Sequence, residues 1–408
     1  SFRFQEKRHP MTSTASDADT PLPFNSARLD SIMDAAGLDA IVATSKHNIR
    51  YLLGGYTFFF FDTMVAIGLT RYLPALVYVK GRPDQALYIG CDIEKHEEQN
   101  GRFWPANLSL GNVGTTDAMQ RAAAYIESLG AIRTIGIEVA FLPLDAHRAL
   151  REGLSNNIRL ADAMIPLERL RAVKSPKEIE FLRFASDRVV DSMQVTFARH
   201  CMPGATKHEV TTALIQEEMS RGLEFDYNQI TSGLSHNRAP SDQRLAEGDI
   251  ISLDSGGNYK GYIGDLCRMG IIGEPNAEQE DLLGYIEEVQ QAARHPIRAG
   301  GRGGDIADIA VPMGSGSAHS PYTNFIVHGM GLVSHEAPRL MSEPRFSYAG
   351  DDADRPLEAG MCLSIETTMR HPKCGFIKLE DTLLVTDDGW EGLGDGARGW
   401  NRAGTGSA

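Results

Sequence analysis

The stretch from residue 249 to residue 269 limits the possible folds of this chain more than any other. Its sequence, DIISLDSGGNYKGYIGDLCRM, alternates apolar and polar residues around Ile251 and Leu253, which is typical of a strand with one buried face. Three glycines then permit a tight return into a second strand. Such a hairpin brings Asp254 and Asp265, eleven residues apart, close together, and two close carboxylates repel unless a proton or a cation lies between them. Acids beside glycines also cap surface turns, so this stretch alone leaves a simple turn role open.

The length and the charge of the chain exclude several classes of protein. Its 408 residues are enough for two domains with buried cores. A formal net charge of −14 argues against nucleic acid or an anionic membrane as a partner. The most apolar tract, residues 57–79, is interrupted by Asp62, Arg71 and Pro74, which favours buried strands over a membrane span. Five cysteines without a CxxC spacing predict reduced thiols and a cytoplasmic location.

Alternating helical and strand patterns predict an α/β domain over residues 24–165. A polar stretch interrupted by prolines, MTSTASDADTPLP, precedes it and predicts a flexible tail over residues 1–23. In the domain, the periodicity predicts helices at 25–36, 118–129 and 144–154, and strands at 40–44, 75–79, 86–90 and 134–139.

From residue 166 the pattern changes to long helices, which predicts a second domain over residues 166–395. The sequence SPKE at 175–178 is a typical helix start, and long helical periods follow at 208–221 and 277–297. The glycines of 299–317 lack the spacing of a dinucleotide-binding loop. The last residues, 396–408, are rich in glycine and are expected to form a second flexible tail.

Two histidines lie in the segment FIVHGMGLVSHEAP, residues 325–338. His328 and His335 are seven residues apart, and the glycines between them disfavour a continuous helix such as the HExxH helix of zinc proteases. A neutral imidazole binds borderline transition metals and also carries protons. A lone histidine in apolar surroundings is usually structural, but two in a glycine-flanked loop are candidates for chemistry.

Two further segments each place a glutamate on the polar face of an apolar strand. In MCLSIETT (361–368) that residue is Glu366, and in GFIKLEDTLLV (375–385) it is Glu380, which shares its face with Lys378. A buried carboxylate is costly without a partner, and a cation is a natural one. Two solvent-facing glutamates on edge strands would produce the same pattern, so the pattern alone does not exclude that arrangement. Four carboxylates and one imidazole in one chain nevertheless suit a centre for two divalent transition-metal ions.

The ordered set of candidate ligands resembles the metal-ligand signature of the M24 metallopeptidase family: Asp254, Asp265, His328, Glu366 and Glu380. The segments that carry the resemblance are GDIISLDSGG, GYIGDLCR, HGMGLVSHEAP, SIETT and KLEDTLLVT. NIRYLLGGY (48–56) and LERLRAVKSPKEIEFLR (167–183) are similar to the two-domain branch that contains aminopeptidase P, prolidase and creatinase. The resemblance implies an α/β N-terminal domain followed by an α+β catalytic domain with the pita-bread fold.

The same resemblance implies a role for each ligand. Asp254 would bind one divalent ion and His328 and Glu366 the other, with Asp265 and Glu380 bridging the two. Glu366 would also take the proton from the water between the ions. Mn²⁺ is the favoured ion, with Fe²⁺, Co²⁺ and Zn²⁺ as alternatives.

Three residues outside the ligand set are implicated in substrate binding or catalysis. By resemblance, His335 would stabilise the developing oxyanion and His236 would contact the substrate or the leaving group. Peptidases of the family commonly have arginine at the position of Lys378, two residues before the last glutamate. Strand parity directs Lys378 to the same face as Glu380, where it is expected to bind an anionic end of the substrate or, alternatively, to pair with a neighbouring carboxylate.

The implied function is hydrolysis of a small amide or an Xaa-Pro peptide bond by a hydroxide that bridges two metal ions. The resemblance leaves open a non-peptidase activity on the same fold, such as that of ectoine hydrolase, a creatinase-like amidinohydrolase or a dimethylsulfoniopropionate lyase. A non-catalytic binding module is a third possibility, and the complete ligand set argues against it. The expected partners are a small molecule or short peptide and a second copy of the chain in a homodimer.

Overall fold

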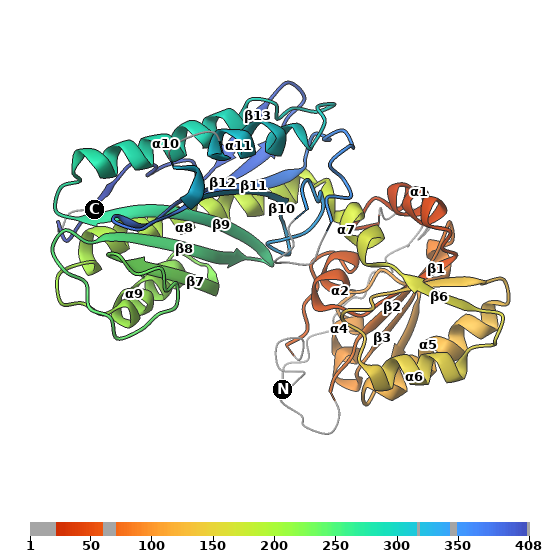
Figure 1. Ribbon diagram of the computed structural model, residues 1–408. Helices are drawn as coiled ribbons and strands as arrows, with labels where there is room; N and C mark the ends of the chain where they lie inside the picture. The colour runs from red at the N-terminus through yellow and green to blue at the C-terminus, as the bar shows by residue number, and fades with distance from the viewer. Residues whose placement is uncertain (1–21, 60–70, 316–318, 343–348, 406–408) are drawn as a thin grey trace, which may run out of the picture.

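The computed structural model describes residues 22–59, 71–315, 319–342 and 349–405, and these form two domains (Figure 1). An α/β N-terminal domain is followed by an α+β domain, as expected from the sequence. The predicted tail over residues 1–23 lies almost wholly outside the described residues. Among the helices of the described ranges, none is both long and apolar enough to cross a membrane.

The N-terminal domain contains a six-stranded mixed sheet in the order β4-β3-β2-β1-β5-β6. Its strands are β1 (Ala40–Ala43), β2 (Ala75–Val79), β3 (Leu87–Gly90), β4 (Asn107–Leu110), β5 (Thr134–Ile137) and β6 (Arg159–Asp162). Its helices and 3₁₀ turns are α1 (Ser26–Ala36), α2 (Lys46–Leu52), η1 (Pro83–Gln85), η2 (Asp92–Glu94), α4 (Lys95–Gln99), α5 (Thr115–Leu129) and α6 (Leu144–Gly153). One apolar cluster, which includes Val77, Met119 and Leu150, packs α5 and α6 against the sheet.

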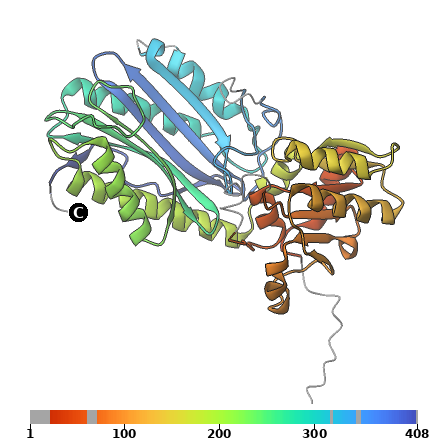
Figure 2. The ribbon, with the colours of Figure 1, turned by 90° about the horizontal axis from the view of Figure 1, so that it is seen from below.

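The second domain contains a larger sheet in the order β10-β11-β12-β9-β8-β7, with β13 beside β12 and β14 beside β9. Its strands are β7 (Glu224–Ser232), β8 (Ile250–Tyr259), β9 (Tyr262–Ile272), β10 (Thr323–Gly329), β11 (Cys362–His371), β12 (Gly375–Val385), β13 (Trp390–Leu393) and β14 (Asn401–Ala403). Its helices are α7 (Met164–Ala172), α8 (Pro176–His200), α9 (Lys207–Ser220), α10 (Ala277–Arg294), α11 (Asp305–Ser315) and the 3₁₀ turn η3 (Ser320–Tyr322). Helix α8 packs on β8 and β9, and α10 packs on β11 and β12, so the helices support the sheet along its length (Figure 2).

The predicted helix start at 175–178 shows how the local sequence fixes where α8, the long helix that packs on the larger sheet, begins. The Ser175 side chain accepts a hydrogen bond from the backbone N–H of Glu178, and the Glu178 carboxylate accepts one from the backbone N–H of Ser175. Pro176 occupies the first turn, where the backbone N–H that proline lacks has no helical partner in any case. Helix α8 therefore begins at a defined residue and runs beneath the hairpin formed by β8 and β9.

The prediction of a flexible tail over residues 396–408 is wrong for its described part. Strand β14 pairs in parallel with β9, with Asn401 opposite Gly270. The Asn401 side chain donates a hydrogen bond of 2.9 Å to the Met269 carbonyl, and Trp400 is buried. The glycine content suggested a coil, whereas Arg398, Trp400 and Asn401 anchor the segment to the sheet.

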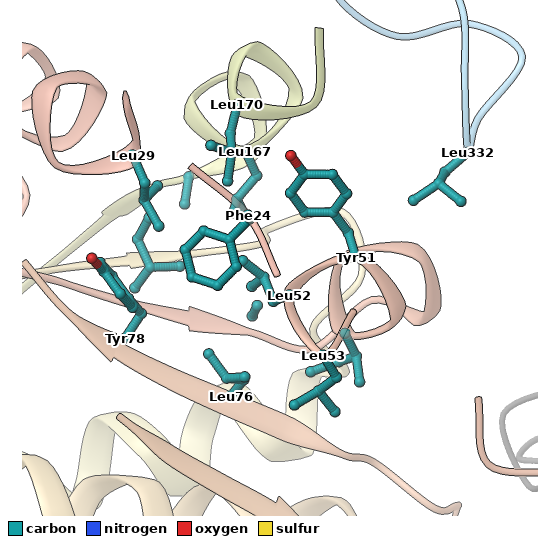
Figure 3. Close-up of a cluster of buried hydrophobic side chains, with 14 of the residues drawn as sticks. Phe24, Leu29, Tyr51, Leu52, Leu53, Leu76, Tyr78, Leu167, Leu170 and Leu332 are labelled. Carbon is teal, nitrogen blue, oxygen red and sulfur yellow. The ribbon is translucent and has the colours of Figure 1, made fainter. Parts of the chain in front are cut away.

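The two domains share an apolar cluster. It joins Phe24 and Tyr51 of the N-terminal domain to Leu170 of α7 and to Leu332, which lies in the loop after β10 (Figure 3). Aromatic rings contribute much of the buried area in clusters of this kind. The loop after β10 is thus packed against α2 of the other domain.

A buried polar cluster reinforces the contact between the domains. Arg171 of α7 pairs with Glu336 at 2.8 Å and also donates a hydrogen bond to the Asn48 side chain of α2. Lys174 contacts the other oxygen of Glu336 at 3.2 Å. All four side chains are nearly inaccessible to solvent, so each charge depends on its partner. Glu336 directly follows His335, and the cluster therefore ties the His335 loop to the N-terminal domain.

Candidate metal centre

The five candidate ligands lie on five strands of the larger sheet, and four of them line one cavity. Asp254 is on β8, Asp265 on β9, His328 on β10, Glu366 on β11 and Glu380 on β12. Glu366 and Glu380 are directly opposite each other in the antiparallel pairing of β11 with β12. Four of these side chains, all but His328, line a cavity of about 250 Å³ together with Lys378 and His335. The structure therefore brings together residues that are up to 126 positions apart in the sequence (380 − 254).

The hairpin of β8 and β9 places the two aspartates as strand parity predicts. Asp254 lies opposite Cys267, and Asp265 lies opposite Gly256. A Cβ atom at position 256 would lie 2.3 Å from the Tyr227 ring, so only glycine allows Tyr227 to reach over the strand. The Tyr227 side chain partly opposes the rise in the pKa of Asp265 that burial and neighbouring charges cause. Gly256 thus allows the Tyr227 ring to lie close to Asp265.

His328 is oriented as a metal ligand would be. Its Nδ1 lies 3.1 Å from the carbonyl oxygen of Gly329, and because a carbonyl can only accept, Nδ1 carries the proton. The other ring nitrogen, Nε2, therefore presents a lone pair, and it is buried without a hydrogen-bond partner among the described residues. It lies 3.7 Å from Oε1 of Glu366 and 3.9 Å from Oε1 of Glu380. Donor atoms that share one ion at about 2.1 Å are about 3 to 4 Å apart, so this arrangement fits a divalent cation.

Asp265 has an environment that favours a cation. Burial raises the pKa of its carboxyl well above the usual range, and the charges of Glu380 and Asp254 raise it further. Its carboxylate oxygen, the His328 nitrogen and a Glu380 oxygen lie within 4.8 Å of one another. A divalent ion among these three groups would offset the repulsion between the carboxylates.

His335 lies beside the centre. Its ring stacks on that of His328, with centroids 3.7 Å apart and an angle of 19° between the planes. It is half-buried, it lines the cavity, and one of its nitrogens lies within 4.8 Å of donor atoms of His328 and Glu366. The position is open to a substrate and close to the ligands, as the role predicted for His335 requires.

Lys378 extends into the centre of the carboxylate cluster. Its Nζ lies 2.7 Å from Oδ2 of Asp254, 2.7 Å from Oε2 of Glu366 and 2.7 Å from Oε2 of Glu380. Burial alone would lower the pKa of Lys378, but these three carboxylates outweigh it and raise the pKa well above the usual range. Its side chain is only 4% exposed. Of the two predicted roles for Lys378, pairing with neighbouring carboxylates is the one that this geometry favours.

The structure does not bring His236 into the cavity. His236 is exposed in the loop that follows β7, and it is not among the lining residues. Arg238, two residues further on, lines the cavity instead and forms an ion pair with Oδ2 of Asp254. Its guanidinium also lies over the Phe376 ring, 5.2 Å from the centroid. Sequence reasoning missed Arg238 and Tyr227, since neither belongs to a segment with the ligand pattern.

Two family profiles match the chain and together cover most of it. Residues 180–387 match the profile of metallopeptidase family M24, and residues 26–173 match that of the creatinase/prolidase N-terminal domain. The first match spans every candidate ligand. The second coincides with the six-stranded sheet and its helices, together with α7.

Individual relatives agree with the family matches over nearly the whole chain. An Xaa-Pro dipeptidase from Pyrococcus horikoshii is 24% identical over 371 residues, which are 88% of this chain and 93% of the relative. The solved structure of an Xaa-Pro dipeptidase from Bacillus anthracis superposes with a TM-score of 0.74 at 24% identity, covering 91% of this chain and 96% of that one. An X-Pro aminopeptidase from Thermotoga maritima superposes with a TM-score of 0.71 at 20% identity, covering 91% and 99%. The larger domain has the pita-bread fold of these structures.

Proposed function

Because the chain belongs to metallopeptidase family M24, we propose that it is a metal-dependent hydrolase that cleaves Xaa-Pro peptide bonds in short peptides. The observation that carries this proposal is the convergence of four carboxylates on one cavity, with Nε2 of His328 lying 3.7 Å and 3.9 Å from two of them, Glu366 and Glu380. The cavity, about 250 Å³, is close to the lower limit of small-molecule sites, about 300 Å³, and suits a short substrate. The P. horikoshii relative, an Xaa-Pro dipeptidase, supports the choice of substrate class.

His328, Asp265 and Glu380 are the residues that would hold a divalent ion, since their donor atoms lie within 4.8 Å of one another. When bound, such an ion would act as a Lewis acid and would lower the pKa of a water molecule bound to it into the neutral range. The oxygen-rich donor set with a single imidazole suits Mn²⁺, which we propose as the ion. The Ser364 hydroxyl donates a hydrogen bond of 2.9 Å to Oε1 of Glu380 and fixes that carboxylate in position.

Glu366 and His335 are the proposed acid–base and oxyanion groups. Glu366 lines the cavity and lies on the strand beside that of Glu380, where it can accept a proton from the attacking water. His335 lies at the same wall, where its ring can donate a hydrogen bond to the carbonyl oxygen as negative charge develops.

Arg238 is the cation best placed to receive an anionic end of the substrate. Its side chain is 29% exposed and lines the cavity, whereas Lys378 is buried among three carboxylates. A guanidinium offers a planar set of donors to a carboxylate, and one edge of it remains for a ligand after Arg238 pairs with Asp254. We assign the role first expected of Lys378 to Arg238.

The same proposal extends to the assembly and the location of the protein. All five cysteines are buried and none is in a disulfide, which fits a reducing cytoplasm. A homodimer is proposed from the resemblance to the two-domain branch. Light scattering on the purified protein gives the molar mass in solution and so tests this.

A substrate panel tests the proposal. The purified protein, loaded with Mn²⁺, is offered Xaa-Pro dipeptides, longer Xaa-Pro peptides, ectoine, creatine and dimethylsulfoniopropionate, with chelator-treated protein as the control. We expect release of the residue before proline, and loss of that release on chelation. Turnover of one of the three non-peptide compounds, with no cleavage of any Xaa-Pro peptide, would overturn it.

A further inference from the structure

We propose that the ammonium group of Lys378 occupies the second cation position of this centre, so that the folded chain binds one divalent ion tightly rather than two. The inference deepens the proposed function, because it concerns how the same metal centre is built. It departs from the two-ion centre that the family resemblance implies.

The two glutamates show that Lys378 lies where a second cation would. Each directs one oxygen towards His328 and the other towards Lys378. Oε1 of Glu366 and Oε1 of Glu380 lie 3.7 Å and 3.9 Å from Nε2 of His328. Oε2 of each glutamate lies 2.7 Å from Nζ of Lys378. Both carboxylates therefore lie between two cation positions. One is beside His328, and the ammonium of Lys378 occupies the other.

Asp254 belongs to the Lys378 side of the centre. Its Oδ2 lies 2.7 Å from Nζ of Lys378 and is also paired with Arg238. Asp254 is absent from both groups of donors around His328 that could share an ion within the described residues. The aspartate that the family resemblance assigns to the other ion is thus engaged by two side-chain cations.

The balance of charge leads to the same conclusion. When all are ionised, as metal ligands are, the four carboxylates of Asp254, Asp265, Glu366 and Glu380 contribute −4, and the two cations Lys378 and Arg238 contribute +2. One divalent ion brings this buried set to neutrality, whereas two would leave an excess of +2. Uncompensated charge of either sign is expensive in a buried site.

The chemistry of lysine suits the position. An ammonium is a compact point charge, and here three carboxylate oxygens lie 2.7 Å from it, of which Oδ2 of Asp254 accepts a hydrogen bond. To admit a second ion, Nζ would have to give up all three contacts. Arginine, by contrast, has a planar fork too wide to occupy the place of a single ion.

Metal stoichiometry tests the inference without reference to any substrate. The full chain is stripped with chelator and titrated with Mn²⁺ by calorimetry, and bound metal is counted by elemental analysis. We expect one tightly bound ion per wild-type chain. Lys378→Met should bind two, and the second ion should bind more weakly than the first. The control is Lys373→Met, which removes an exposed lysine from the turn before β12 and should still bind one. Two tight ions in the wild type, or one in a folded Lys378→Met protein, would overturn the proposal.

A second variant keeps the test independent of the folding of Lys378→Met. If Asp254 only contacts side-chain cations, Asp254→Asn should leave one ion bound, with a Kd changed by less than about tenfold, as for a group outside the direct ligands. His328→Ala, by contrast, should remove the tight ion. Loss of an ion in Asp254→Asn would show that Asp254 is a ligand and would refute the inference. A failure of the substrate panel leaves these stoichiometries unaffected, so the two proposals fail separately.

Discussion

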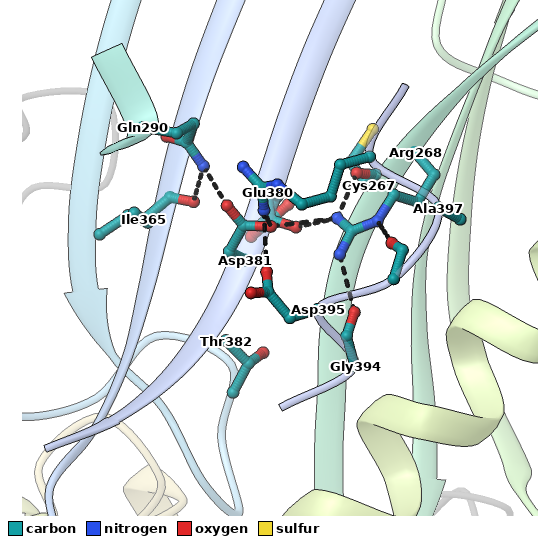
Figure 4. Close-up of polar contacts among 12 residues, drawn as sticks. Cys267, Arg268, Gln290, Ile365, Glu380, Asp381, Thr382, Gly394, Asp395 and Ala397 are labelled. Carbon is teal, nitrogen blue, oxygen red and sulfur yellow. Dashed lines mark hydrogen bonds and ion pairs between the residues drawn. The ribbon is translucent and has the colours of Figure 1, made fainter. Parts of the chain in front are cut away.

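Glu380 and Asp381 are neighbours on β12, yet their side chains lie in opposite electrostatic surroundings. Glu380 faces the cavity, in a group of four carboxylates with the two side-chain cations Lys378 and Arg238. Asp381 points to the other side of the sheet, where it meets Arg268 at 3.2 Å (Figure 4). Arg294 lies 3.0 Å from the same carboxylate. The strand therefore separates two buried ionic clusters.

The two clusters differ in whether their charges balance. Behind the sheet, the guanidiniums of Arg268, Arg294 and Arg398 face Asp381, Asp395 and Glu287, three charges of each sign. Burial alone would raise the pKa of Asp381, but the three arginines outweigh it and hold the pKa well below the usual range. In the cavity, the pKa of Asp265 is shifted the opposite way. The balanced cluster needs no further ion to compensate its charges, whereas the cavity cluster lacks two positive charges and is suited to receive a divalent ion.

The largest expected effect comes from breaking the cavity cluster at Glu380. Glu380→Gln removes a ligand while keeping its shape, so we expect metal affinity and kcat/KM to fall by more than about 100-fold, beyond the effect typical of an outer partner. The stability of the metal-free protein should not fall, because a like charge has been removed. Calorimetric metal titration, peptide turnover and thermal unfolding measure the three quantities. Full metal occupancy with normal turnover would show that Glu380 is not a ligand.

The matching change behind the sheet should damage stability instead. Asp381→Asn leaves three guanidiniums with too few counter-charges, and we expect the free energy of unfolding to fall by about 3–5 kcal/mol. The protein that remains folded should bind as much metal as the wild type. Asp387→Asn, an exposed change two residues past the end of β12, is the control and should be neutral. Denaturant unfolding distinguishes the two variants, and an equal small effect in both would remove the contrast between the clusters.

A smaller and purely kinetic effect is expected at the edge of the cavity. His335→Ala should keep the metal and lower kcat by about 100- to 1,000-fold, the range for a lost oxyanion donor, with little change in KM. Steady-state kinetics on the metal-loaded variant, alongside its metal content, measure this. Loss of the ion would instead make His335 a ligand, which its distance from His328 and Glu366 also permits.

The smallest expected effect concerns a buried acid whose pKa shift arises mainly from burial. Burial raises the pKa of Glu218 to about 7, and the Ser255 hydroxyl, which donates to it at 2.7 Å, only partly opposes the shift. The folded state thus holds this proton more strongly than the unfolded state does, so its contribution to stability is fully present below about pH 4.5 and is lost as pH rises to about 7. Glu218→Gln should therefore gain up to about 3 kcal/mol relative to the wild type between pH 5 and pH 8. Urea unfolding at both pH values measures it, with the exposed Glu224→Gln as control, and a pH-independent difference would contradict it.

Strand parity accounts for what the sequence could predict of the site. The alternation in 361–368 and 375–385 assigns Glu366 and Glu380 each to the polar face of its strand. In the structure the two residues are paired directly opposite each other on the neighbouring strands β11 and β12. Loops lack such a period. The histidine expected at the substrate, His236, is exposed, and Arg238 takes the place at the cavity because the turn after β7 directs its side chain there.

The ordered C-terminal segment and the contacts of Lys378 show a second limit. Residues 396–405 have a coil-like composition, and tertiary contacts anchor them: the ion pairs of Arg398, the burial of Trp400 and the pairing with β9. Glu287, which pairs with Arg398, and Gly270, which lies opposite Asn401, are both more than 100 residues away in the sequence. Parity likewise placed Lys378 on the cavity face, but the identity of its three partners depends on how β8, β11 and β12 are brought together.

The link from Asn48 through Arg171 to Glu336 has a consequence for how this protein can vary. Glu336 follows His335, so the position of that imidazole is set partly by a side chain of the other domain. The N-terminal domain therefore helps to set the conformation of the loop that carries His335. Sequence drift around α2 can alter turnover while every residue of the cavity is retained, and a chimera that exchanges N-terminal domains would inherit a misaligned loop unless this trio is carried over with it.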